Sequence, residues 1–342
     1  MKEILQSSIV WLRCSALAVN MASINIAGTE LKVKDYCCIE AGNYFEPLFD
    51  AEYLKKRRLK LWLYVNVTDR CNAGCLFCVS AALPTNMNIV NPQQFRKVLE
   101  VVAPHIYGIS FTGGEPMLYP ELLDELVHIT EEIVPSDAEI DLVTNGTWLA
   151  RLSELKSIDR ITSVHISRHS SDTVVNNAIM RQIGPEEKEI KQFIQSLNDP
   201  GKVVLNCVLQ KGGVSTMDDV AAYLEFAINA GVQNSSFITM FKANSHCEAN
   251  YISAFEFPFV SDNQVISWNR LHPDNRFSVW NRHSDYEFCH CLSGSYKNKE
   301  GHTRFYFRCP GTGSSPDYCR QLVYTADNHL QDGFGKNRTV IL

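Results

Sequence analysis

Segments rich in β-branched and aromatic residues alternate with segments of helical periodicity over the middle of the chain. Residues 60–68 (KLWLYVNVT) have the length and composition of a strand, whereas residues 92–105 repeat apolar positions at helical spacing. Strands are predicted at 60–68, 107–112, 138–144, 161–167, 202–210 and 234–241, and helices at 92–105, 120–134, 149–158, 186–198 and 216–231. Such alternation favours an α/β fold with a parallel sheet and right-handed crossovers.

Periodicity alone leaves two architectures open, a partial barrel and an open doubly wound sheet, since a complete barrel needs eight strand–helix units. In both, ligands gather at the C-terminal ends of the strands. The pattern divides the chain into an N-terminal extension (1–58), an α/β unit (59–242) and a C-terminal extension (243–342). In the last, the turn NKEG at 298–301 predicts a hairpin whose paired positions sum to about 599.

Composition and charge exclude several classes of protein. Hydrophobic residues make up 45% and charged residues 20%, as in ordinary globular proteins. The formal charge of −6 provides no global basic field, so we expect no nucleic-acid partner. The apolar N-terminal run is interrupted by Arg13, and no apolar run reaches the length of about eighteen residues that a membrane span needs. The sequence therefore predicts a cytoplasmic protein whose 12 cysteines are reduced and serve metal binding or chemistry.

Three cysteines, Cys71, Cys75 and Cys78, follow the first predicted strand. At this spacing, three thiolates can bind three irons of a [4Fe–4S] cube and leave the fourth iron open. Gly74 allows the loop to bend tightly, and Phe77 offers a flat apolar face beside the cluster. A zinc knuckle would need a fourth ligand, but no Cys or His follows at finger spacing, and buried unligated thiols suit a polar loop poorly. The spacing therefore predicts an iron–sulfur site.

With this triplet, the chain resembles the radical S-adenosylmethionine (SAM) superfamily, whose motif has the same cysteine spacing after the first strand of a partial barrel. The second strand ends in a segment similar to the family's Gly-Gly-Glu-Pro motif, and Gly113, Gly114, Glu115 and Pro116 match it residue by residue. The resemblance implies a partial (β/α)6 TIM-type barrel in which this segment holds the amino group of SAM. The chemistry agrees, because an ammonium group needs acceptors and glycines let backbone carbonyls approach closely.

The ends of the third and fourth strands carry further candidates. Asn145 is expected to line the SAM pocket, although the Asn145–Gly146 pair is equally a plain turn. The resemblance implies that Ser167 and Arg168 contact the ribose and carboxylate of SAM, and an arginine fork suits a carboxylate. His169 is either a substrate contact or a hydrogen-bonded structural histidine.

The resemblance also implies a reaction and an electron donor. The reduced cluster passes one electron to the sulfonium of SAM, the C5′–S bond breaks, and a 5′-deoxyadenosyl radical abstracts hydrogen from a substrate C–H bond. The electron comes from a donor such as flavodoxin or ferredoxin.

The C-terminal extension contains four further candidate ligands, Cys289, Cys291, Cys309 and Cys319. The predicted hairpin brings Cys291 within reach of Cys309. The resemblance implies a second, auxiliary [4Fe–4S] cluster, as in the SPASM/twitch-like extensions of some relatives, although Cys-x-Cys is tighter than their usual spacing. Zinc assisted by His290, or unligated thiols in an aromatic core, are the alternatives.

The function expected is that of a radical SAM enzyme, with the subclass open among oxidoreductase, lyase, isomerase and transferase. The leading hypothesis is modification of a ribosomally synthesised peptide, because the tail cysteines suit it and the N-terminal extension can hold a leader peptide by strand addition. An alternative is a small-molecule substrate, such as a natural-product, sugar or nucleotide intermediate. A second alternative is a non-catalytic iron–sulfur or zinc scaffold, although a scaffold needs no SAM ammonium site.

Overall fold

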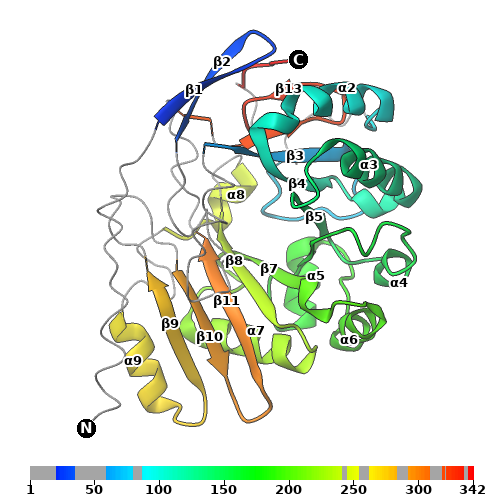
Figure 1. The fold of residues 1–342 in the computed structure, drawn as a ribbon. Helices are drawn as coiled ribbons and strands as arrows, with labels where there is room; N and C mark the ends of the chain where they lie inside the picture. The colour runs from blue at the N-terminus through cyan, green and yellow to red at the C-terminus, as the bar shows by residue number, and fades with distance from the viewer. Residues whose placement is uncertain are drawn as a thin grey trace.

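The computed structural model describes residues 21–34, 59–79, 87–240, 245–253, 262–282, 292–308, 318–319, 321–334 and 338–342. Its centre is an 11-stranded sheet with the strand order β13-β12-β3-β4-β5-β6-β7-β8-β11-β10-β9 (Figure 1). A separate two-stranded antiparallel sheet consists of β1 (Met21–Ile26) and β2 (Thr29–Lys34).

Six neighbouring parallel strands form the core of the large sheet. They are β3 (Leu61–Thr68), β4 (Ile106–Gly113), β5 (Glu139–Thr144), β6 (Ser163–Ser167), β7 (Val203–Leu209) and β8 (Asn234–Thr239). Each begins and ends within two residues of its predicted position. The α/β fold with a mostly parallel sheet, the arrangement of a partial TIM-type barrel, is therefore confirmed.

Helices cover the outer face of these strands (Figure 1). They are α2 (Pro92–Val102), α3 (Pro120–Ile133), α4 (Leu149–Leu152), α5 (Thr173–Met180), α6 (Glu187–Ser196) and α7 (Met217–Asn229), with the short 3-10 helices η2 (Ala103–His105), η3 (Pro116–Leu118) and η4 (Pro200–Lys202). The core between the layers is aromatic and aliphatic: Phe95 of α2 packs against Phe111 of β4 and Tyr324, with ring centroids 6.3 and 5.6 Å apart. No helix of the described residues is long and apolar enough to cross a membrane.

Burial along β3 shows how the sequence pattern produces the two faces. Leu61, Leu63 and Val65 are buried, whereas the alternate residues are partly exposed. Because successive side chains of a strand point to opposite faces, the buried set lies under the helices and the alternate set lines the interior of the curled sheet.

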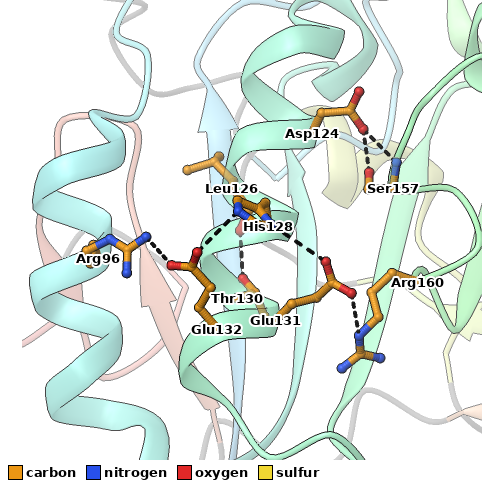
Figure 2. A network of polar contacts seen from close by, with 9 residues as sticks. All are labelled: Arg96, Asp124, Leu126, His128, Thr130, Glu131, Glu132, Ser157 and Arg160. Carbon is orange, nitrogen blue, oxygen red and sulfur yellow. Dashed lines mark hydrogen bonds and ion pairs between the residues drawn. The ribbon is translucent and has the colours of Figure 1, made fainter.

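A network of polar contacts on the outside of the barrel joins α3 to α2 and to the turn segment between α4 and β6 (Figure 2). Arg96 of α2 pairs with Glu132 of α3, and Glu131 of the same helix lies 3.3 Å from Arg160. The Asp124 carboxylate accepts a 3.0 Å hydrogen bond from the backbone amide of Ser157. Since the ion pairs are exposed, they orient the helices more than they stabilise the fold.

The C-terminal extension adds strands to both edges of the barrel sheet. At one edge β11 (His302–Arg308) runs parallel to β8, followed by β10 (Leu292–Lys297) and β9 (Arg276–Arg282). At the other, β12 (Gln321–Tyr324) runs parallel to β3, followed by β13 (Leu330–Gln331). Two helices of the extension, α8 (Ser245–Asn250) and α9 (Asp262–Leu271), were not expected from the pattern.

The predicted hairpin around residues 298–301 is confirmed together with its register. Lys297 pairs with His302, and Leu292 pairs with Phe307. The predicted proximity of Cys291 and Cys309 lies outside the described residues.

Candidate functional site

The three-cysteine loop follows β3 and is held by the C-terminal end of α5. The amide of Gly74 donates to the carbonyl of Met180, and the amide of Leu76 donates to that of Ile179, both at 3.0 Å. Carbonyls at a helix end have no partner within the helix, so they are free to accept these bonds. Arg181 ends the helix with a left-handed backbone, at φ 50°. The loop is therefore anchored to a helix that sequence patterning did not predict.

The three thiols influence one another electrostatically. Cys71 is exposed, and Cys75 and Cys78 are partly exposed. Burial is the main cause that raises the pKa of Cys71 and of Cys75, the latter to about 12. The Glu115 carboxylate and the Cys78 thiol contribute at Cys71, and the Cys78 and Cys71 thiols contribute at Cys75. A cationic cluster reverses this effect, because a coordinating thiol is deprotonated by the metal. The donor set therefore fits an iron–sulfur cluster.

Single-ion sites have a different geometry. Within the part of the chain that the structure describes, no three His, Cys, Asp or Glu side chains converge on one ion position. A cube does not require such convergence, because each thiolate binds a different iron.

The Gly-Gly-Glu-Pro segment lies directly against the start of the cysteine loop. The amide of Gly114 donates to the carbonyl of Thr68 at 2.7 Å, and the amide of Glu115 donates to that of Arg70 at 2.8 Å. Gly113 has a φ of +116°, a conformation that favours glycine. Both glycines are therefore needed for the two motifs to lie side by side.

Glu115 is 1% exposed, and its side chain accepts three hydrogen bonds. Its carboxylate accepts hydrogen bonds from the backbone amide of Met117 at 3.0 Å, the hydroxyl of Thr144 at 2.7 Å and the backbone amide of Asn145 at 2.7 Å. Burial raises the pKa of Glu115, and these three bonds partly offset the effect. The described residues provide no cationic partner, so a buried carboxylate remains to which the ammonium of SAM is complementary. Pro116 is buried beside it at the start of η3.

Asn145 links the end of β5 to the cysteine loop. Its side-chain nitrogen Nδ2 donates to the side-chain oxygen of Asn72 at 2.7 Å, and Nδ2 of Asn72 donates to the hydroxyl of Thr147 at 3.1 Å. Asn72 lies directly after Cys71. The motif pattern points to Asn145 but not to Asn72, Thr144 or Thr147, whose only sequence signal is that they are polar residues just after two strands or at a strand end.

Ser167 and Arg168 lie in different environments. Ser167 ends β6 and is partly exposed, on the interior face of the sheet. Arg168 is fully buried: its guanidinium donates to the carbonyl of Pro185 at 2.9 Å and lies 3.8 Å from the ring centroid of Phe226 in α7. The guanidinium is thus engaged in the helix layer, and the structure does not bring it together with Glu115.

His169 packs against Phe77 of the cysteine loop. Its ring lies 4.1 Å from the ring of Phe77, centroid to centroid, and the amide of Val208 donates to its Nδ1 at 3.0 Å. Burial, assisted by the charge of Arg168, lowers the pKa of His169 to about 3. The imidazole is therefore neutral, with its proton on Nε2. The thiol of Cys247 in α8 donates to the carbonyl of Phe77 at 3.4 Å, so two elements hold this loop residue.

Of the candidate ligands in the tail, Cys319 is the one that the structure describes. It is buried between the two sheets: its amide donates to the carbonyl of Lys32 at 2.8 Å, and its thiol donates to that of Gln321 at 3.4 Å. Burial raises the pKa of Cys319 to about 12. The other candidates lie outside the described residues: Cys289, Cys291 and Cys309.

A family model described as the Radical SAM superfamily matches residues 65–248. The match covers more than half of the chain and includes both the cysteine triplet and the Gly-Gly-Glu-Pro segment. The chain therefore belongs to the radical SAM superfamily, whose enzymes use a [4Fe–4S] cluster and SAM.

Curated relatives include several GTP 3′,8-cyclases. One from Mycolicibacterium smegmatis is 29% identical over 179 residues, which are 50% of this chain and 48% of that protein. GTP 3′,8-cyclase 2 of Mycobacterium tuberculosis is 32% identical with the same coverage. The enzyme of Aquifex aeolicus is 30% identical over 187 residues, 52% of this chain and 55% of that protein. The chain thus spans about half the length of these relatives.

Solved structures of similar fold extend the match beyond the barrel. Streptococcus suis SuiB bound to S-adenosylmethionine has a TM-score of 0.55 at 15% identity, covering 82% of this chain and 63% of that one. SuiB bound to the precursor peptide SuiA has a TM-score of 0.51 at 15% identity, covering 85% and 64%. A radical SAM methyltransferase from Sphaerobacter thermophilus has a TM-score of 0.52 at 10% identity, covering 92% and 82%. At these identities the likeness shows the fold.

Proposed function

We propose that this radical SAM enzyme binds its [4Fe–4S] cluster through Cys71, Cys75 and Cys78. The proposed SAM site consists of Phe77, Gly113, Gly114, Glu115, Pro116, Asn145 and Ser167. When bound, the cluster and SAM supply a 5′-deoxyadenosyl radical for hydrogen abstraction from a substrate C–H bond. One observation carries the proposal: the 2.8 Å bond from the amide of Glu115 to the carbonyl of Arg70 places a buried carboxylate beside the cysteine loop.

The protein's own groups bind and orient the cofactors. The Glu115 carboxylate accepts hydrogen bonds from the SAM ammonium in addition to those from the chain. The Asn145–Asn72 hydrogen bond holds the cysteine loop against the end of β5. Phe77, fixed by His169, keeps water away from the cluster on that side. Arg168 is left out of the proposed site because its guanidinium is bonded within the helix layer.

Anaerobic reconstitution tests the ligands directly. A variant in which all three triplet cysteines are replaced by alanine should lose this cluster and release no 5′-deoxyadenosine from SAM. Cys207→Ala is the matched control, because that thiol is fully buried in β7 and belongs to neither site. Release of 5′-deoxyadenosine by the triple variant would show the ligand assignment to be wrong.

We further propose an auxiliary [4Fe–4S] cluster in the C-terminal extension (243–342), bound by Cys289, Cys291, Cys309 and Cys319. Iron content should then approach that of two cubes, and the triple variant should retain about half of it, because the two sites fill independently. A triple variant without iron would exclude the auxiliary cluster, and zinc in its place would indicate a structural site. Flavodoxin or ferredoxin is the proposed electron donor, to be tested by replacing a chemical reductant.

As substrate we propose a ribosomally synthesised peptide. Its support is the likeness to SuiB bound to a precursor peptide over 85% of this chain, which includes more than the barrel. The described residues of the N-terminal extension (1–58) contain β1, whose strand partner is β2 alone, so that an extended peptide can pair with its other edge.

A nucleotide is the second candidate, because identities of up to 32% relate the barrel to GTP 3′,8-cyclases. The test adds GTP, or peptides encoded by neighbouring genes, to the reconstituted enzyme. The two measurements are the stimulation of 5′-deoxyadenosine formation and the transfer of deuterium from the labelled substrate to 5′-deoxyadenosine. Stimulation by GTP alone would exclude the peptide proposal.

A further inference from the structure

The interior face of the barrel has an unusual charge balance. The six parallel strands β3 to β8 contain no lysine and no arginine. Their carboxylates and imidazole belong to Glu139, Asp141 and His165, which occupy the partly exposed positions of β5 and β6. These positions alternate with buried ones under the helices, so the three groups face the barrel interior. Strands of this composition lack the arginine guanidinium groups that bind phosphates in a bidentate manner.

Four of the interior side chains form one connected network. The Ser163 hydroxyl donates to the Asp141 carboxylate at 2.6 Å, and Nε2 of His165 lies 2.8 Å from Ser163 Oγ and 3.4 Å from the other Asp141 oxygen. Nδ1 of His165 lies 3.1 Å from the side-chain oxygen of Asn206. Since the single Ser163 proton goes to Asp141, Nε2 of His165 donates to Ser163, and since the Asn206 oxygen can only accept, Nδ1 donates to Asn206. The network thus fixes the orientation of the imidazole.

The network can be reached from the barrel interior and has unused capacity. The side chains of His165 and Asp141 are 13% and 16% exposed. Asn206 pairs in register with Ser167 on one side and Ser236 on the other, so these side chains form one row across three strands. The Ser236 hydroxyl is fully buried and has no hydrogen-bond partner among the described residues. The row therefore presents donors and acceptors beyond those that the chain uses.

On the neighbouring strands β3 and β4, aromatic rings lie beside the polar row. A Cβ on Gly108 would lie 2.3 Å from the Trp62 ring, so this ring lies across the glycine. Its Nε1 donates to the Ser110 hydroxyl at 2.8 Å, and Tyr107 packs edge-on at 5.1 Å between centroids. The polar row on β5 to β8 thus lies beside an apolar surface on β3 and β4, a combination typical of small-molecule and side-chain sites.

We propose that Asp141, His165, Asn206 and Ser236 form the substrate-recognition site and bind an uncharged hydroxyl or amide group of the substrate. The inference rests on the proposed function, which places the substrate in the barrel. A hydroxyl or amide both donates and accepts, and so matches the Asp141 carboxylate and the Ser236 hydroxyl together. A phosphate or carboxylate would meet the Asp141 charge, while these strands contain no lysine or arginine to bind it and the His165 imidazole is already engaged by Asp141, Ser163 and Asn206. A peptide side chain and a sugar ring share this chemistry.

The test follows the imidazole signals of histidine-labelled protein, reconstituted anaerobically and loaded with SAM, by NMR. The probes are N-acetylserinamide for the peptide source, ribose for the sugar source and inorganic diphosphate for the charged class. One of the neutral probes should shift the His165 signals, which His165→Phe identifies by their loss, and diphosphate should not. Asn206→Leu should weaken the response about five- to tenfold. Ile238→Val, a conservative change at a partly exposed apolar position of β8, should leave it unchanged.

The outcomes separate the two proposals. A stronger response to diphosphate than to the neutral probes overturns the inference, and so does the absence of a response to both neutral probes. Iron content and substrate-free SAM cleavage are measured on the same preparation. Protein that cleaves SAM but gives no His165 response contradicts the recognition site alone, whereas a response without SAM cleavage contradicts the proposed function alone. Of the two neutral probes, the one with the stronger response shows whether the bound hydroxyl or amide group belongs to a peptide or to a sugar.

Discussion

Gly114 lies so close to Arg70 that a Cβ added to the glycine would be 1.8 Å from the Arg70 carbonyl oxygen. The contact partner is backbone, so it cannot move away as a flexible side chain would. We predict that Gly114→Ala pushes the two motifs apart, destabilises the protein by about 1–3 kcal/mol, and reduces both iron content and SAM affinity. Thermal unfolding, iron analysis and calorimetric titration with SAM measure the three effects.

Gly74 provides the matched control in the same region. A Cβ there would meet only the Arg181 side chain, at 3.5 Å, which is an ordinary contact. Its φ is not in the left-handed region, so the tight bend anticipated for this glycine does not require it. Gly74→Ala should therefore keep iron content and stability near those of the wild type. Equal losses in the two alanine variants would contradict the steric explanation.

Replacement of Glu115 should affect both the fold and SAM binding. In Glu115→Ala, three buried donors lose their acceptor, so the free energy of unfolding should fall by about 2–4 kcal/mol. Glu115→Gln keeps an oxygen for Met117 and Thr144 but meets the Asn145 amide with a donor, so its loss should be smaller. Both should weaken SAM binding, since neither supplies a charge opposite the ammonium. Urea unfolding and calorimetry distinguish the effects, with the exposed Glu121→Ala as control. Unchanged SAM affinity in Glu115→Gln would restrict this residue to a structural role.

Local sequence signals predicted the strands and the chemistry, whereas contacts between distant segments could not be read from them. The hairpin register at Lys297 and His302 followed from a four-residue turn, and the cysteine triplet from its spacing. By contrast, α5 is only eight residues long, and two of them are asparagines and two are adjacent valines, so its sequence favours a helix weakly. Its start depends on the N-cap hydrogen bond to the Asp172 side chain. The pairing of β12 with β3 joins residues more than 250 positions apart, for which no local pattern exists.

The position of Arg168 illustrates the same limit within the site. Sequence places it at a strand end, where an inward-pointing arginine suits a carboxylate. The side chain instead follows strand alternation: Ser167 faces the barrel interior, so Arg168 faces the helices and stacks on Phe226. The motif singled out Glu115, but two of its three hydrogen-bond partners, Thr144 and Asn145, come from the end of β5 and could be recognised as partners in the structure alone.

The neutral state of His169 predicts a specific pH dependence of stability. Its pKa is about 3 in the folded protein and about 6.5 when unfolded, so the unfolded state binds the extra proton between these values. The stabilisation is complete above about pH 6.5 and decreases as pH falls towards 3, by up to about 3–5 kcal/mol. His169→Gln, which keeps an acceptor for the Val208 amide, should lose this part of the slope. Urea unfolding at several pH values measures it, and the exposed His128→Gln should retain the wild-type slope. An unchanged slope in His169→Gln would mean that other groups cause the acid sensitivity.

Trp62 and Gly108 should behave as a coupled pair. A Cβ at Gly108 would lie 2.3 Å from the indole ring, so Gly108→Ala should displace Trp62, break its hydrogen bond to Ser110 and cost about 1–3 kcal/mol. Trp62→Leu alone should cost about 2–4 kcal/mol, because it removes packed ring atoms and leaves space beside the glycine. In the double variant the new methyl group occupies part of that space, so the total loss should be smaller than the sum of the single losses by at least about 1 kcal/mol. Urea unfolding of the four proteins provides this comparison. Additive losses would mean that the two side chains do not compete for the same volume, and that the indole does not lie across the glycine in solution.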